Sequence, residues 1–393
     1  MTSAQEYGDR CVALFDIGTG NISGSLVLMS LHHRPRIIAA HTYKITLDDE
    51  ANHSLGDIVR EIARGVESVG DALVRAGAGA PVAIEAYISS SWTTSQTRTI
   101  TFQKNRPFVV KESMVLDMLE REYRLFSEKE RALYQQVGDD IFRIDVEVTD
   151  SFANGYRVSE LFGKTASDIN LVTYMSVTSR SLVDVLNESF SKVFHSTPVR
   201  YRSYSLAQFA LARVLYPHID RSVHVGIRER ETEIMLVTDT TMKKTVTFPV
   251  GSQVFIDAVA EQFGCTDTEA ETYLTLHQEK HLAQEQVHRI EGAIARASKT
   301  WLELFQKALI VEGERALIPE TVILFSKPLL ADIFSEVIGG DVFIQYRLTD
   351  STFTVRSVEN EILRHFIDSD AKTHPVNTVL VGGIFSNMLY QKK

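Results

Sequence analysis

The chain has 393 residues, of which 44% are hydrophobic and 23% charged, and its formal net charge at pH 7 is −10. This length suffices for two or three domains, each with its own core. The acidic balance and the lack of any Lys- or Arg-dense stretch argue against nucleic-acid binding. The two cysteines, Cys11 and Cys265, have no metal-ligand spacing, so neither a zinc site nor a disulfide framework is indicated.

The N-terminal residues, MTSAQEYGDRC, contain no apolar core of signal-peptide length. The longest apolar stretches, such as residues 22–31, are too short to cross a membrane. We therefore expect a cytoplasmic protein without a direct membrane span, peripheral at a membrane only through its partners.

The first predicted elements form a hairpin and a helix. Residues 12–15 and 25–30 predict two strands, which the turn Asp16-Ile17-Gly18-Thr19-Gly20-Asn21 joins. A third strand is predicted over residues 36–45. Residues 55–75 predict a helix, because their apolar side chains recur at steps of three and four.

A region with a different pattern of predicted elements follows, and we interpret it as a small α+β module inserted into the larger domain. Its predicted elements are strands over 82–89 and 97–102, a helix over 111–123, a strand over 142–148 and the hairpin turn Asn154-Gly155. Acids alternate along the last strand and at its end, at Asp145, Glu147 and Asp150. This alternation is typical of a solvated face rather than of paired carboxylates. A strand over 170–177 and a helix over 181–194 then resume the larger domain.

A second unit begins near Arg221 with another hairpin. Its predicted elements are strands over 223–226, 232–238 and 244–250, helices over 253–263 and 283–308, and strands that start at 321–325 and 378–383.

Two halves that each open with a strand, a turn and a returning strand resemble the actin-like ATPase superfamily. The turn from Asp16 to Asn21 is similar to the first phosphate loop of that superfamily. The inserted module, placed after the first helix of the first half, resembles the branch of FtsA, a bacterial cell-division protein, and PilM of type IV pilus assembly. The resemblance implies an α/β, actin-like duplicated two-domain fold with a small inserted strand–helix–strand–strand domain. The implied divisions are 1–81 and 169–219 for the first half, 82–168 for the insert, 220–320 for the second half and 321–393 for the C-terminal elements.

The resemblance also implies a site for ATP and magnesium. Asp16 would hold the metal through a water molecule, and the amides of the turn would bind phosphate oxygens. The implied nucleotide-binding residues are Asp16, Gly18, Thr19, Gly20, Asn21, Thr232 and Gly251. The alternative is that the turn is only a tight hairpin whose glycines accept positive φ angles.

The second phosphate loop departs from the pattern of the superfamily. Gly226 stands where an acid belongs, and Arg228 stands where a glycine would let the backbone approach phosphate. Positioned oxygen ligands are central to phosphoryl transfer, so we expect ATP to be bound weakly or not at all and the chain not to be an enzyme.

The adenosine side of the implied site has two candidate strand ends. Chain order favours Phe325-Ser326-Lys327, which lacks the glycine pair of the superfamily. The alternative, Val381-Gly382-Gly383, has the glycines but comes late in the chain, so we interpret it as a turn at a strand end. The lysine that follows an Ala-Glu pair in the superfamily is replaced, after Ala270-Glu271, by Leu274.

By resemblance, the first functional hypothesis is an FtsA-like cell-division adaptor that organises a membrane-associated machine through protein–protein contacts. Self-association through the inserted domain is part of this expectation. A PilM-like cytosolic adaptor of type IV pilus assembly is the second hypothesis. The chain ends at residues 390–393 without the amphipathic helix of FtsA-like proteins, which argues against direct membrane attachment and keeps the pilus role close behind the division role. A rival of another class is an active actin-like ATPase.

Overall fold

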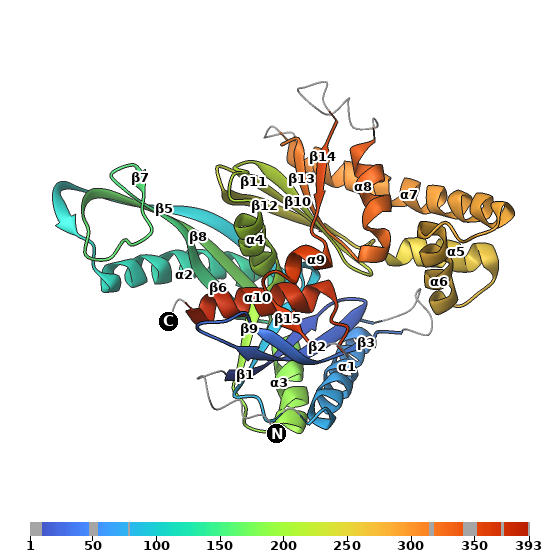
Figure 1. Cartoon of the computed structure of the whole chain (residues 1–393). Helices are drawn as coiled ribbons and strands as arrows, with labels where there is room; N and C mark the ends of the chain where they lie inside the picture. The colour runs from blue at the N-terminus through green and yellow to red at the C-terminus, as the bar shows by residue number, and fades with distance from the viewer. Residues whose placement is uncertain are drawn as a thin grey trace.

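The computed structural model describes residues 10–46, 54–77, 79–313, 318–340, 352–370 and 373–391. Two larger sheets lie one above the other with helices around and between them, and a smaller sheet with one long helix extends to the side (Figure 1). No helix within these ranges combines the length and the apolarity that crossing a membrane requires.

The first sheet has six strands in the order β15-β3-β2-β1-β4-β9. They are β1 (Arg10–Ile17), β2 (Asn21–Met29), β3 (Arg36–Lys44), β4 (Ala83–Ile88), β9 (Val199–Ser203) and β15 (Asp368–Ser369). Alternate side chains of β1 point to opposite faces, as a strand requires. Phe15 packs on one face with α1 (Leu55–Arg75) and α3 (Arg180–Phe194). Leu14 packs on the other face with α4 (Tyr204–Leu215) and α10 (Asn377–Gln391).

Helix α1 confirms the predicted helix over 55–75. Ser54 caps its N-terminus, and the carboxylate of Asp57 completes a capping box by accepting a hydrogen bond from the Ser54 amide. The predicted apolar stripe is buried from Ile62 onward, at Ile62, Val66, Val69 and Leu73.

The second sheet has five strands in the order β12-β11-β10-β13-β14. They are β10 (Ser222–Ile227), β11 (Thr232–Thr238), β12 (Thr241–Phe248), β13 (Thr321–Phe325) and β14 (Thr354–Ser357). The order repeats that of β3-β2-β1-β4-β9, so the duplication predicted from the two hairpins is confirmed. The remaining helices of this part are α5 (Gln253–Phe263), α6 (Asp267–Gln278), α7 (Gln284–Gly313), α8 (Ala331–Gly339) and α9 (Asn360–Leu363), with a short 3-10 turn at Pro328–Leu330.

Helices α4 and α10 lie between the two halves. Met235 of β11 and Ile323 of β13 belong to the same buried cluster as Leu14 of β1, and this cluster includes residues of both helices. The second sheet therefore packs against α4 and α10 from one side and the first sheet packs against them from the other.

The smaller sheet has the order β5-β8-β6-β7, with α2 packed against it. Its elements are β5 (Thr93–Val109), α2 (Glu112–Gln136), β6 (Ile141–Ala153), β7 (Tyr156–Arg157) and β8 (Thr165–Ser179), after a 3-10 turn at Ser90–Trp92. Asn154 and Gly155 have φ angles of 52° and 81°, which confirms the predicted hairpin turn between β6 and β7.

Two strands belong to sheets other than those predicted. β4 was expected in the insert, but it pairs in parallel with β1 and β9 in the first sheet. β8 was expected in the larger domain, but it pairs with β5 and β6 in the inserted sheet. Both strands are buried over most of their length, and such a strand carries no local signal of the sheet that it joins.

The predicted strand over 378–383 is wrong, because these residues lie in the helix α10. Most of α10 is buried, so its sequence lacks the polar face that would distinguish a helix from a buried strand. Its glycines permit close packing rather than forming a turn. A Cβ atom on Gly382 would lie 3.0 Å from the ring of Tyr87, and one on Gly383 would lie 2.6 Å from Ile367.

Candidate functional site between the two halves

The turn after β1 and the turn after β10 approach each other from the two halves. In the first turn, the amide of Gly18 donates to the carbonyl oxygen of Asn21 at 3.1 Å. In the second turn, the amide of Arg228 donates to the carbonyl oxygen of Glu231 at 2.9 Å. Each turn is therefore closed by its own backbone hydrogen bond.

Arg228 reaches across this junction to Asp16. Its Nη2 donates to both carboxylate oxygens of Asp16, at 2.7 Å each. Its Nε lies 3.3 Å from a carboxylate oxygen of Glu231, and the guanidinium lies 4.9 Å from the ring centroid of Tyr204. Burial opposes the charge of Arg228, but Asp16 and Glu231 raise its pKa, so the side chain stays protonated. Arg228 and Asp16 thus form a buried ion pair, with exposed fractions of 7% and 1%.

A second contact joins the same two turns. Nδ2 of Asn21 donates to Oε1 of Glu229 at 2.7 Å. Burial raises the pKa of Glu229. We call these four residues, Asp16, Asn21, Arg228 and Glu229, the latch, because they link one half to the other.

The glycines of the implied phosphate site lie against the protein's own atoms. A Cβ atom on Gly18 would lie 2.7 Å from Nη2 of Arg228, and one on Gly20 would lie 2.5 Å from Cβ of Glu229. On Gly251 it would lie only 2.0 Å from the carbonyl oxygen of Arg228. Glycine at these positions leaves room for Arg228 and Glu229, the two residues of the second turn that belong to the latch.

The other predicted residues differ in their surroundings. Thr232 donates to the carbonyl oxygen of Val250 at 2.7 Å and accepts from Nε1 of Trp301 at 2.9 Å. It therefore connects β11, the segment after β12 and the helix α7. The Thr19 hydroxyl is buried near the junction and has no hydrogen-bond partner among the described residues.

A cavity of about 230 Å³ lies beside the latch. It is lined by Asn21, Tyr204, Gln208, Arg228, Lys327 and Asn377, among others. Ser326 and Lys327, which follow β13, line this cavity, whereas Gly382 and Gly383 do not, so the favoured candidate for the adenosine side is the one beside the junction. Lys327 forms an ion pair of 2.5 Å with Glu271 of α6. Leu274 of the same helix is buried in the hydrophobic core of the second half.

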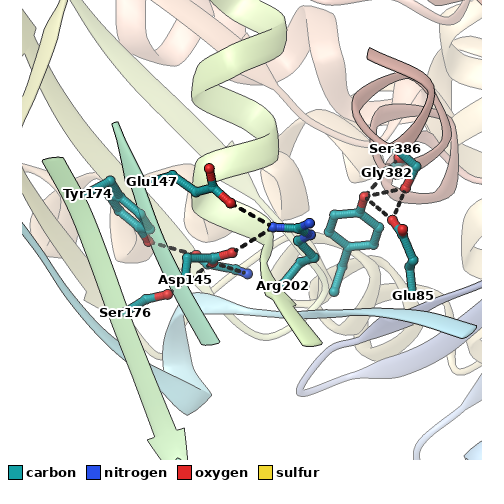
Figure 2. Close-up of polar contacts among 10 residues, drawn as sticks. Glu85, Asp145, Glu147, Tyr174, Ser176, Arg202, Gly382 and Ser386 are labelled. Carbon is teal, nitrogen blue, oxygen red and sulfur yellow. Dashed lines mark hydrogen bonds and ion pairs between the residues drawn. The ribbon is translucent and has the colours of Figure 1, made fainter. Parts of the chain in front are cut away.

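No local pattern predicted the buried ionic cluster where the insert meets the first half. Figure 2 shows Arg202 of β9 between Asp145 and Glu147 on one side and Glu85 and Ser386 on the other. Nη1 of Arg202 lies 3.3 Å from Asp145 and 3.1 Å from Glu147. Burial raises the pKa of Asp145 to about 6, although Arg202 and two further hydrogen bonds oppose this rise.

The interpretation of the alternating acids as a solvated face is therefore wrong for Asp145 and Asp150, which are 1% and 6% exposed. The alternation is real, but this face of β6 turns toward arginines of the first half. Arg202 reaches Asp145, and Arg213 of α4 reaches Asp150 at 3.1 Å. The arginines lie more than 50 residues further along the chain, so no local pattern could predict the pairing.

A second cavity, of about 320 Å³, lies between β6, α4 and α10. We call it the groove. It is lined mainly by apolar residues, including Val148, Phe209, Val214, Phe385, Met388 and Leu389. Val148 and Val214, which both line the groove, are 36% and 40% exposed, so part of its apolar lining is open to solvent.

Within the described residues, no three His, Cys, Asp or Glu side chains come together as a metal site. Asp16, the predicted metal residue, has both carboxylate oxygens engaged by Arg228.

The sequence matches no protein-family model and no curated protein. Among solved structures, it is similar to the PilM-PilN type IV pilus biogenesis complex, with 14% sequence identity and a TM-score of 0.58. The match covers 96% of this chain and 98% of that chain. It also matches the ethanolamine utilization protein EutJ from Carboxydothermus hydrogenoformans, with 11% identity, 98% and 91% covered, and a TM-score of 0.44. The match to the PilM structure, together with the repeated strand order, shows the actin-like fold in the form found in PilM.

Proposed function

We propose that this protein is an actin-like adaptor of the PilM kind, which docks on a membrane-anchored partner and does not hydrolyse ATP. The observation that carries the proposal is the match to PilM over nearly the full length of both chains. That structure is a complex of PilM with PilN, and we infer that a PilN-like protein is the partner of this chain. Peripheral association with the inner membrane would follow from such docking.

The latch supports the non-enzymatic part of the proposal. Asp16 would have to release Arg228 before it could orient a magnesium-bound water, and the pair is buried. Gly226 leaves the second turn without its acid, and a Cβ there would lie 2.6 Å from Oε1 of Gln208, so a larger residue would have to displace that side chain. These residues do not fit ATP with magnesium, and no step of the proposed function uses them.

The groove is the surface that we propose for docking. Its apolar lining suits an apolar segment of a partner chain, because burying such side chains is favourable by about 25 cal/mol per Å². Arg213 and Glu147 at its edge are already paired with Asp150 and Arg202, so the partner need not supply a charge to neutralise them.

The test is a fluorescence anisotropy titration with a labelled peptide. The probe is the cytosolic tail of the PilN-like protein encoded in the same genome. We expect saturable binding to the wild type and at least a tenfold loss of affinity in Val214→Glu, which places a charge in the groove. Val74→Glu is the matched control, because Val74 is also an exposed valine in the last turn of a helix, but it lies on α1.

Failure of the wild type to bind the peptide would overturn the pilus proposal. Equal affinities of Val214→Glu and the wild type would show that docking occurs elsewhere. The division role, which was the first hypothesis from the sequence, is discriminated by gene neighbourhood: division genes beside this gene would favour an FtsA-like adaptor. Self-association through the inserted domain stays a prediction.

A further inference from the structure

The helix α4 connects the latch to the groove. At its N-terminal end, the Tyr204 ring lies under the guanidinium of Arg228, and Gln208 lies against Gly226. Phe209 and Val214, further along the same helix, line the groove. One twelve-residue helix therefore contacts both sites.

The helix α10 makes the same connection in parallel. Its first residue, Asn377, donates from Nδ2 to the carbonyl oxygen of Ser326 at 3.0 Å, beside the cavity next to the latch. Phe385, Met388 and Leu389, near its other end, line the groove. The two helices pack against each other in the core between the halves (Figure 1).

The ionic cluster fixes the groove end of α10 to the insert. The Tyr87 hydroxyl lies 3.1 Å from the carbonyl oxygen of Gly382 and also contacts Ser386, and Ser386 bonds to Glu85. Arg202 of β9, in the centre of Figure 2, bonds to Asp145 of β6. Polar contacts therefore join α10 to β4 and β9 to β6, and β4 pairs with β9 in the first sheet.

Packed helices move as rigid bodies rather than deforming continuously. A change in the spacing of the two halves at the latch cannot be absorbed within α4 or α10, because their side chains are close-packed in the shared core. The displacement has to appear at their other ends, where the groove lies.

We propose that the latch takes the place of a bound ligand in holding the two halves together, and that α4 and α10 transmit this state to the groove. The groove therefore binds the partner without any nucleotide, and breaking the latch weakens this binding. This inference rests on the docking proposed above. It adds that the affinity of the groove is controlled by residues of the junction that do not touch the partner.

The experiment repeats the peptide titration with variants of the latch. We expect Arg228→Met and the milder Asp16→Asn to lower the affinity for the peptide at least fivefold, the lower end of typical coupling between sites. Lys327→Met is the matched control. It breaks an ion pair beside the same cavity, but Lys327 and Glu271 both belong to the second half, so we expect its affinity to equal that of the wild type.

A measurement without the partner separates the two proposals. Spin labels at Glu188 of α3 and at His281 before α7, in a background without Cys11 and Cys265, report the distance between the halves. The distance distribution should broaden in both latch variants and match the wild type in Lys327→Met. Unchanged distances would overturn the latch, and changed distances with unchanged peptide affinity would overturn the coupling. Absence of binding by the wild type, with changed distances in the variants, would overturn the docking proposal alone.

Discussion

Replacing Arg228 with methionine should strongly destabilise the protein. The substitution leaves Asp16 and Glu231, each 1% exposed, as buried carboxylates without their cation. Removing one partner of a buried ion pair costs about 3–5 kcal/mol, because the remaining charge stays out of water. Glu229 is half-buried beside them, so we expect a loss in the upper part of this range.

The loss of stability in Arg228→Met should depend on the charge of Asp16. Adding Asp16→Asn to Arg228→Met removes one unpaired charge, so the double variant should recover about 1–3 kcal/mol relative to additivity.

The assay is equilibrium unfolding in urea at pH 7, with circular dichroism as the readout. Lys327→Met is the control, because its ion pair is more than a third exposed and should contribute no more than about 1 kcal/mol. If Arg228→Met unfolds within about 0.5 kcal/mol of the wild type at pH 7, the ion pair with Asp16 does not hold the halves together.

Two further substitutions test the packing and the ionic cluster. Gly251→Ala should lower the free energy of unfolding in urea by at least about 2 kcal/mol, because its Cβ would lie 2.0 Å from the backbone oxygen of Arg228. Gly292→Ala in α7, whose Cβ would have its nearest neighbour at 3.8 Å, should raise it by about 0.5–1 kcal/mol. Equal effects of the two would refute the close approach. Burial raises the pKa of Asp145 from 3.8 to about 6, so the folded protein holds this proton more firmly than the unfolded chain. The wild type should therefore lose up to about 3 kcal/mol relative to Asp145→Asn as the pH rises from about 4 to 6.5, and a gain over this range would contradict the assignment.

Local patterns were sufficient for most of the elements. The hairpins of β1 with β2 and β10 with β11, the amphipathic helix α1 and the turn at Asn154-Gly155 all carry their signal within a few residues. The repeated hairpin also indicated the duplicated fold, because the same strand order is rebuilt around each one.

Features that depend on distant residues could not be predicted in this way. The sequence indicated that Arg228 would obstruct a phosphate, but not that its guanidinium lies on Asp16, which is 212 residues away. The burial of Asp145 depends in the same way on Arg202, and the helix α10 depends on being covered on all sides. In each case a tertiary contact overrides what the local pattern favours.

The central claim is that the junction between the halves is filled by the protein's own side chains and does not serve ATP hydrolysis. The most direct measurement is a calorimetric titration of the wild type with ATP and magnesium, followed by a phosphate-release assay. We expect no binding heat and no phosphate release above the rate without protein. Phosphate release that Asp16→Ala abolishes would contradict the account.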